Sequence, residues 1–147
     1  MSVEIRILGP NERGVLTRVA PDVFDHDIDM ALSEEFLRDP RHHLAVAIDA
    51  GVVVGFASAV HYVHPDKAPE LWVNEVGVAP SHRRQGVGER LLQTLFARAS
   101  QLGCRMGWVL TSPANMGAMR LYESAGGSLL TDPPAMFTFR LPADPTT

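Results

Sequence analysis

The part of the sequence that most constrains the fold is a basic, glycine-rich turn between a predicted strand and a long amphipathic helix. The strand ends at Val78-Ala79-Pro80, and the turn reads Arg83-Arg84-Gln85-Gly86-Val87-Gly88. Gly103 is placed to end the helix, which is predicted to begin near Gly86. Apolar side chains follow the i, i+4 spacing of one helix face at Leu91, Leu92, Leu95, Ala99 and Leu102. A strand followed directly by a helix indicates a domain that contains both kinds of element.

Hydrophobic periodicity elsewhere predicts further strands and helices. Strands are predicted at 3–7, 44–48, 52–60, 71–78, 107–111 and 136–141, with a hairpin turn at Asp49-Ala50-Gly51. Helices are predicted from Asn11 to about Val19, through Met30 to Leu37, and over 115–125, where Ala118, Leu121, Tyr122 and Ala125 share one face. This order indicates a single α/β or α+β domain over residues 1–147 with a mixed sheet, and residues 142–147 are expected to form a frayed tail.

Composition and charge exclude several classes of protein. The 147 residues suffice for one domain with a substantial core, and 46% of them are hydrophobic. The net charge of −4 disfavours binding to nucleic acid or to an anionic membrane, because phosphate surfaces need a basic partner face. The single cysteine, Cys104, excludes an internal disulfide and suits a reducing compartment. No segment resembles a signal peptide and no apolar run reaches the roughly 18 residues of a membrane span, so we expect a cytoplasmic protein.

The basic turn has the properties of an anion cradle. Gly86 and Gly88 allow a phosphate to approach the main chain, and the first turn of the following helix offers unpaired N–H groups. Arg83 and Arg84 add positive charge. A P-loop would end in Gly-Lys-Ser/Thr, and a Rossmann turn would need a third glycine where Leu91 stands. A solvated arginine pair beside a helix start, with no ligand, stays open as the alternative.

Two motifs together resemble one known family. The pattern Arg83-x-x-Gly86-x-Gly88, preceded by Val76-Gly77-Val78-Ala79-Pro80, is similar to the acetyl-CoA loop of the GCN5-related N-acetyltransferases, the GNAT family. That family's later motif, Asn-x-x-Ala-x-x-Leu-Tyr-x-x-x-Gly, is matched by Asn115, Ala118, Leu121, Tyr122 and Gly126. The resemblance implies a mostly antiparallel mixed sheet of about six to seven strands flanked by about four helices.

Within that family the chain is similar to small, single-domain aminoglycoside 3-N-acetyltransferases. The similarity lies in the run His82-Arg83-Arg84-Gln85-Gly86 and in the acidic residue Glu75 before it. Those enzymes carry an acidic turn after the penultimate strand, where this chain has Thr111-Ser112-Pro113-Ala114. A polycationic drug would bind better if that negative charge were present, and it is missing here. Aminoglycosides are therefore only one expected acceptor class among small cationic amines.

The resemblance implies an enzyme that moves an acetyl group directly from acetyl-CoA to a primary amine, without a metal. It places the pantetheine arm against the main chain of Val76, Gly77 and Val78 as an added strand. It assigns the pyrophosphate to Arg83, Arg84, Gln85, Gly86, Val87, Gly88 and Glu89. Asn115 would hydrogen-bond the pantetheine, and Tyr122 would donate a proton to the leaving thiolate. A core aromatic whose hydroxyl is satisfied elsewhere is the alternative for Tyr122.

The acceptor amine must lose a proton before it attacks, and Glu75 is the candidate base. Glu75 stands between apolar residues of its strand, where an unpaired carboxylate is unfavourable, and an ion pair with an arginine is the alternative reading. Trp72 and Asn74 are placed on the opposite face of the strand, and Trp72 is a weaker substrate-binding candidate. Asp25 and Asp27 belong to the densest acidic stretch, which would attract a cationic amine unless it is an ordinary solvated loop.

The remaining reactive side chains are not assigned to a site. His61 and His64 lack a third ligand, as does the pair His42-His43, so no metal site is predicted. Cys104 is expected to pack in the core. A non-catalytic acyl-CoA-binding regulatory module remains the alternative function, because the same turn would bind CoA in both cases. The expected partner is a small amine rather than nucleic acid or membrane, and whether the chain forms a homodimer stays open.

Overall fold

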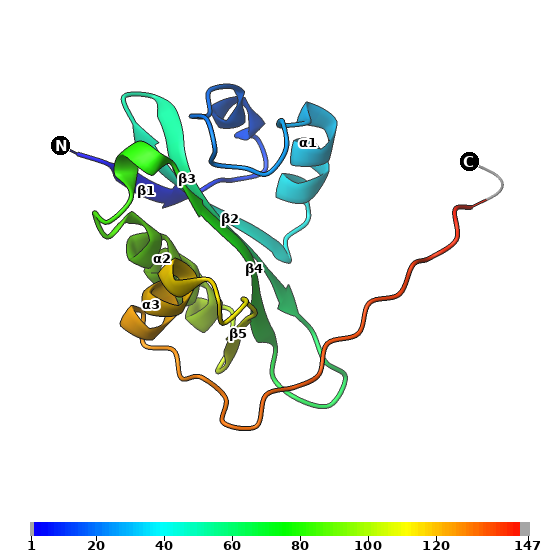
Figure 1. Cartoon of the computed structure of the whole chain (residues 1–147). Helices are drawn as coiled ribbons and strands as arrows, with labels where there is room; N and C mark the ends of the chain where they lie inside the picture. The colour runs from blue at the N-terminus through cyan, green and yellow to red at the C-terminus, as the bar shows by residue number, and fades with distance from the viewer. Residues whose placement is uncertain (1, 145–147) are drawn as a thin grey trace.

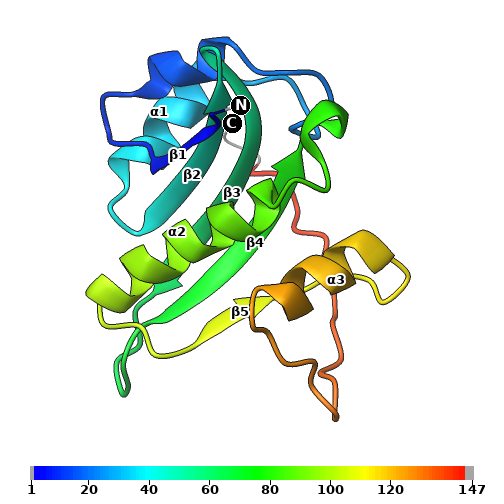
Figure 2. The same ribbon diagram turned by 90° about the vertical axis from the view of Figure 1, so that its left-hand side faces the viewer.

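Residues 2–144 are described by a computed structural model, in which one mixed sheet has helices on both faces (Figures 1 and 2). Residues 145–147 of the expected tail lie outside the described residues. The elements are β1 (Glu4–Ile7), the 3₁₀ helix η1 (Arg13–Thr17), α1 (Met30–Arg38), β2 (His42–Asp49), β3 (Val52–Tyr62), β4 (Glu70–Val78), the 3₁₀ helix η2 (Pro80–His82), α2 (Val87–Gln101), β5 (Gly107–Val109) and α3 (Met116–Ser124). Strands β1 to β4 pair antiparallel in chain order, and β5 pairs parallel with β4. Most of the predicted elements, including the hairpin and the long helix, are confirmed.

The two faces of the sheet are covered by different segments. On one face, a Cβ atom added to Gly55 would lie 3.3 Å from side-chain atoms of both Val87 and Leu91, so α2 packs closely there. On the other face, Phe56 stacks on Phe24, with ring centroids 3.9 Å apart. Figure 2 shows α2 in front of the sheet, α1 behind it, and α3 beside α2. We call these two surfaces the α2 face and the α1 face.

Helix α2 supplies much of the core. Leu91, Leu92 and Leu95 are at most 1% exposed, and burying each such side chain contributes roughly 1.5–3 kcal/mol. The predicted stripe is wrong only at Leu102, which is the C-cap residue and is 40% exposed. The chain leaves the helix there because Gly103 adopts a left-handed φ of 92°.

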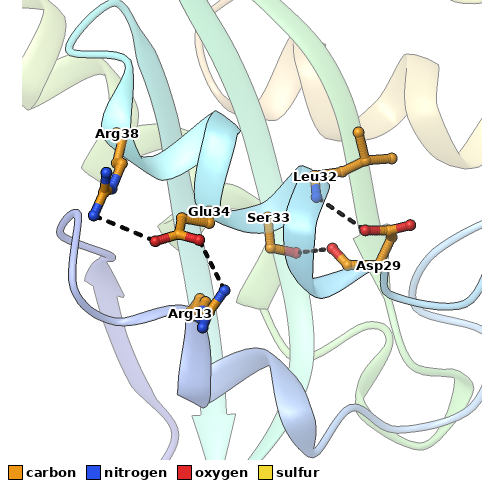
Figure 3. Close-up of polar contacts among 6 residues, drawn as sticks. All are labelled: Arg13, Asp29, Leu32, Ser33, Glu34 and Arg38. Atoms are coloured by element: carbon orange, nitrogen blue, oxygen red, sulfur yellow. Dashed lines mark hydrogen bonds and ion pairs between the residues drawn. The ribbon is translucent and has the colours of Figure 1, made fainter.

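Helix α1 is fixed by side-chain contacts at its start and along one side (Figure 3). Asp29 is the N-cap, and its carboxylate accepts the main-chain N–H of Leu32 at 2.9 Å. Glu34 forms ion pairs with Arg13 of η1 at 2.9 Å and with Arg38 at 3.3 Å. An N-cap of this kind contributes about 1 kcal/mol, and exposed ion pairs contribute less. These contacts attach η1 to α1.

The helix predicted over residues 11–19 is a short 3₁₀ helix instead. It covers only Arg13–Thr17, and Asn11 does not cap it. The carboxylate of Glu12 accepts a main-chain N–H three residues earlier at 2.8 Å and also pairs with Arg6. These contacts fold the chain into a tight turn at the position where the predicted helix would begin.

The strand predicted over residues 136–141 is also wrong. Residues 128–144 form no helix or strand, and Figure 1 shows them running away from the sheet. An alternating segment becomes a strand only where a neighbouring strand shares its main-chain hydrogen bonds, and no described strand lies beside this one. Residues 2–144 therefore contain five strands rather than six to seven, with three α-helices and two 3₁₀ helices. The apolar side chains left 74–81% exposed are Met136, Phe137, Phe139 and Leu141.

Candidate active site

Strand β4 contains a bulge that decides which way its polar side chains face. The register with β3 passes over Asn74, so Asn74 is an extra residue without a partner on β3. Glu75 and Trp72 pair with residues 58 and 60 of β3, which lie on the same face of that strand. Both side chains therefore lie on the α1 face. The prediction that they occupy opposite faces is wrong, because the extra residue interrupts the alternation.

The same bulge exposes Glu75 to solvent. The premise that its carboxylate is buried between apolar residues is therefore wrong. Among residues 2–144, no side chain forms a hydrogen bond or an ion pair with Glu75, so the alternative pairing with an arginine is not seen there either. The carboxylate is open to water and to a ligand that approaches the α1 face.

Strands β4 and β5 separate after three paired residues. The parallel pairing joins Leu71–Val73 to Gly107–Val109, whereas β4 continues to Val78. Along residues 75–78, the edge of β4 on this side has no neighbouring strand within the described chain. Figure 2 shows β5 and α3 diverging from β4. An extended, amide-bearing ligand can pair with such an edge as an added strand.

Two tryptophans stack at the middle of the parallel pairing. The ring centroids of Trp72 and Trp108 are 6.2 Å apart, and the two residues are 36% and 42% exposed. Trp108 Nε1 donates to Glu70 at 2.7 Å, and His64 lies 2.9 Å from the same carboxylate. The hydrogen bond from Trp108, with His64 nearby, lowers the pKa of Glu70, which keeps a negative charge beside the ring. Sequence reasoning selected Trp72 but missed Trp108 and Glu70, because only the parallel register brings them together.

The basic turn has the main-chain geometry of an anion-binding nest. Arg84 and Gly86 adopt left-handed φ values of 62° and 76° on either side of Gln85. Main-chain N–H groups around such alternating conformations converge on one point and bind anions. Gly86 is also the N-cap of α2, and no side chain caps the first free N–H groups of the helix. A Cβ on Gly86 would meet nothing within 4 Å, so its φ, rather than lack of space, requires glycine.

Two side chains expected to contact the phosphate also brace the turn. Arg83 Nε donates to the carbonyl oxygen of Val78 at 3.1 Å, and Gln85 Nε2 donates to the carbonyl oxygen of Ser81 at 3.3 Å. Arg84 forms no such contact within residues 2–144. Its guanidinium is therefore available to a ligand.

The start of α2 is also attached to α3. A Cβ on Gly88 would lie 3.1 Å from Leu121, so this glycine permits close helix packing. Glu89 accepts a hydrogen bond from the Ser124 hydroxyl at 2.8 Å. A carboxylate in the first helical turn suits the helix dipole but repels a phosphate. Glu89 thus fits the packing of α3 better than a contact with pyrophosphate.

Helix α3 positions the two later candidate residues. Asn115 is its N-cap, and its Oδ1 accepts the N–H of Ala118 at 3.1 Å, which leaves the side-chain NH₂ group for a ligand. Tyr122 is half-buried against the core and lines a cavity of about 370 Å³ between α2, β5 and α3. Burial raises the pKa of the Tyr122 hydroxyl, which therefore stays protonated at neutral pH. No hydrogen-bond partner for this hydroxyl lies within residues 2–144, so a hydroxyl satisfied in the core is not observed.

The acidic segment lies directly against β4. A Cβ on Gly77 would lie 2.2 Å from the carbonyl oxygen of Val23, so only glycine permits this approach. Asp25 and Asp27 follow in an exposed, turn-rich stretch on the α1 side of the sheet. Neither forms an ion pair within the described part of the chain, whereas nearby Asp29 serves as the cap of α1.

The contacts of His43, His61 and Cys104 are those of side chains that support the fold. His43 Nε2 lies 2.8 Å from His61 Nδ1, and burial, with His61 and Arg98 nearby, lowers the pKa of His43 to about 4. Cys104 is buried as predicted, and burial raises the pKa of its thiol. Residues 2–144 contain no group of three or more His, Cys, Asp or Glu side chains that could hold a metal ion. No helix in that range has the length and apolar character needed to cross a membrane.

Comparison with known proteins identifies the family. The profile of the Acetyltransferase (GNAT) family matches residues 14–127. The chain belongs to this family. It is 32% identical over 120 residues to aminoglycoside N(6')-acetyltransferase type 1 of Salmonella typhimurium, covering 78% of this chain and 81% of that enzyme. This GNAT member is an N-acetyltransferase that uses acetyl-CoA, as the sequence resemblance implied.

Solved structures share the fold along almost the whole chain. The aminoglycoside N-acetyltransferase AAC(6')-Iy in complex with CoA has a TM-score of 0.73 and 26% identity, covering 95% of this chain and 96% of its own. Aminoglycoside acetyltransferase meta-AAC0020 with sisomicin has a TM-score of 0.80 at 17% identity, covering 95% and 96%. Two of these enzymes carry the 6′ position in their names, so the comparisons support the resemblance to aminoglycoside acetyltransferases but not its narrower 3-N assignment. The motifs that suggested it lie mainly around the cofactor turn, which does not define the acceptor.

Proposed function

We propose that residues 1–147 act as one cytoplasmic enzyme domain that acetylates a small cationic amine of the aminoglycoside class. The observation that carries this proposal is the unpaired edge of β4, which leads into the anion-binding turn at 83–88. A strand edge followed by a nest fits an extended ligand with amides along its length and a diphosphate at one end. The aminoglycoside enzymes among the relatives support the acceptor class.

The main chain makes most of the proposed contacts with acetyl-CoA. Val76, Gly77 and Val78 offer N–H and C=O groups to the pantetheine amides. The N–H groups of residues 84–88 bind the pyrophosphate, with the Arg84 guanidinium adding charge. The side-chain NH₂ group of Asn115 donates to the pantetheine from the start of α3.

The transfer needs a base for the amine and an acid for the thiolate. When bound, acetyl-CoA supplies a thioester whose carbonyl carbon the amine attacks. Glu75 accepts the ammonium proton directly or through one water, which frees the nitrogen lone pair. The new C–N bond forms, the C–S bond breaks, and Tyr122 donates its hydroxyl proton to the leaving sulfur. The second proton of the attacking nitrogen passes to the tyrosinate, which restores the Tyr122 hydroxyl. The raised pKa of Tyr122 keeps that proton available at neutral pH.

The acceptor is proposed to lie on the α1 face, between the tryptophan pair and the acidic segment. Trp72 and Trp108 present partly exposed rings that can contact a sugar ring or a cationic amine. Asp25 and Asp27 place negative charge beside β4, where it attracts a cation. The negative charge expected after the penultimate strand is thus supplied by another segment.

Thiol release from acetyl-CoA, measured over a panel of amines that includes aminoglycosides, tests this function. We expect release with a polycationic amine and a large loss in Tyr122→Phe, while calorimetry shows unchanged CoA binding. Tight CoA binding without release for any amine would favour the regulatory acyl-CoA-binding module instead. Release only with uncharged amines would contradict the proposed acceptor class.

A homodimer is proposed as the working assembly. The exposed apolar side chains of residues 136–141 support it, because a surface of this kind usually marks an interaction site. Sedimentation at micromolar concentration should give twice the chain mass. A single monomeric boundary that persists at higher concentration would refute the dimer.

A further inference from the structure

A chain of three polar side chains ties the anion-binding turn to the β2–β3 hairpin. His82 Nε2 lies 2.7 Å from Asp49 Oδ2, and His82 Nδ1 lies 2.7 Å from Ser81 Oγ. The side chains of His82 and Asp49 are only 13% and 25% exposed. The contact spans 33 positions in sequence, so it joins two separate parts of the chain just before the turn begins.

Asp49 is held on a rigid support. It pairs with Val52 at the end of the hairpin, and the two turn residues between them, Ala50 and Gly51, have φ values of 51° and 78°. Positive φ at both positions is the geometry of a tight two-residue hairpin turn, which leaves the strand ends little freedom. The Asp49 carboxylate is therefore carried by a tight hairpin turn.

His82 can keep both contacts whatever its protonation state. Its Nε2–H donates to the Asp49 carboxylate, and the Ser81 hydroxyl can either donate to Nδ1 or accept from it. The tie therefore needs a proton on Nε2, which the imidazolium and the neutral Nε2–H tautomer both supply.

The turn requires outside support because its own conformation is strained. Arg84 is not a glycine but has a φ of 62°, and residues in this region persist only where their surroundings impose it. The braces from Arg83 and Gln85 act within the turn and its flanking residues. Among the side-chain contacts of residues 81–86 in the described chain, the His82–Asp49 hydrogen bond is the one that reaches a different part of the sheet.

We propose that Asp49 and His82 are positioning residues that hold the turn in the shape that binds acetyl-CoA. This inference rests on the proposed cofactor role of the turn. Neither side chain belongs to the proposed ligand contacts, so both act by reducing the conformations that the free turn can adopt. Their loss should weaken acetyl-CoA binding while leaving the transfer step unchanged.

Steady-state kinetics with Asp49→Ala and His82→Ala tests the inference. We expect KM for acetyl-CoA to rise about tenfold in each, with kcat within about twofold, because a hydrogen bond to a charged group is lost. The double variant should be no worse than either single one, since both remove the same contact. His82→Gln, whose amide can still donate to Asp49, should recover most of the affinity.

Asp39→Ala is the matched control, because the Asp39 carboxylate also accepts a side-chain N–H, from Arg41 Nε at 3.4 Å, but precedes β2 at the end opposite Asp49. It should leave KM for acetyl-CoA unchanged. An Asp49→Ala variant with a lower melting temperature but wild-type KM would show a merely structural role and overturn the inference. Additive losses in the double variant would do the same.

Hydrogen exchange of the free protein separates this inference from the proposed function. The main-chain amide of His82, which donates to the carbonyl oxygen of Ala79 at 2.9 Å, should exchange faster in Asp49→Ala than in wild type, without any ligand present. If wild type failed to bind CoA in calorimetry, the proposed cofactor role would fail while the exchange result still tested the tie. Equal exchange in both proteins would refute the tie itself.

Discussion

The cofactor half of the proposed site is built from main-chain groups, whereas the acceptor half is built from side chains. On the cofactor side, the edge of β4 and the N–H groups of residues 84–88 face the ligand position, and hydrogen bonds brace the turn. On the acceptor side, exposed side chains from β4, β5 and the 20–29 segment share the α1 face. A main-chain site depends on a short local motif, but a side-chain site can change with each substitution. The first half can therefore stay constant while the second is adapted to another amine.

The largest expected effect tests whether the two halves meet at Tyr122. Tyr122→Phe should lower kcat by roughly a hundredfold or more, because the leaving thiolate loses its acid, with little change in the binding of either substrate. Rapid-quench or thiol-release kinetics measures this. Tyr62→Phe, at the other and largely exposed tyrosine, is the control and should keep wild-type kcat. Equal rates for both variants would remove Tyr122 from the mechanism.

The next-largest effect tests whether the cofactor half binds its ligand through main-chain N–H groups. Gly86→Asp should weaken acetyl-CoA binding about a hundredfold, because the new residue must adopt a φ of 76° and places a carboxylate in the nest. Calorimetry gives the affinity. Gly103→Asp is the matched control, since Gly103 has a φ of 92° and equally open surroundings at the other end of α2. Similar affinities in the two variants would mean that the anion binds elsewhere.

A smaller effect tests Arg84, whose charge is proposed to contact the ligand, whereas Arg83 of the same turn acts as a brace. Arg84→Ala should weaken acetyl-CoA binding about tenfold at low salt and less at high salt, because an exposed charge is screened. Arg105→Ala removes an exposed arginine beyond the far end of α2 and should change nothing. Salt-independent binding in wild type and variant alike would show that charge at position 84 is irrelevant.

The smallest effect concerns the acceptor half. Asp25→Asn with Asp27→Asn should raise KM for a cationic acceptor about threefold at low salt, with the difference lost at high salt. KM for acetyl-CoA should stay constant. Asp66→Asn, in the β3–β4 connection, removes an equivalent exposed charge and serves as the control. An unchanged acceptor KM in the double variant would reassign the acidic segment to an ordinary solvated loop.

Local sequence patterns predicted the parts of the fold that depend on neighbours in the chain. The stripe of α2, the hairpin at Asp49-Ala50-Gly51 and the turn at 83–88 are all of this kind. The bulge at Asn74 could not be predicted, because it depends on the register with β3. The pairing of Trp72 with Trp108 and of Asp49 with His82 likewise needs the tertiary fold. Alternation at 136–141 predicted a strand that lacks a described neighbour to pair with.

The missing side chain of Gly77 has a consequence for the distance between the two substrates. An amine and a thioester carbon react only when held about 3–3.5 Å apart, and a misplacement of about 1 Å can slow a reaction roughly a hundredfold. A methyl group at position 77 would come within 2.2 Å of the Val23 oxygen and force the acidic segment away from β4. The absence of a Cβ atom at position 77 thus keeps the proposed acceptor and cofactor surfaces close enough for the new C–N bond to form.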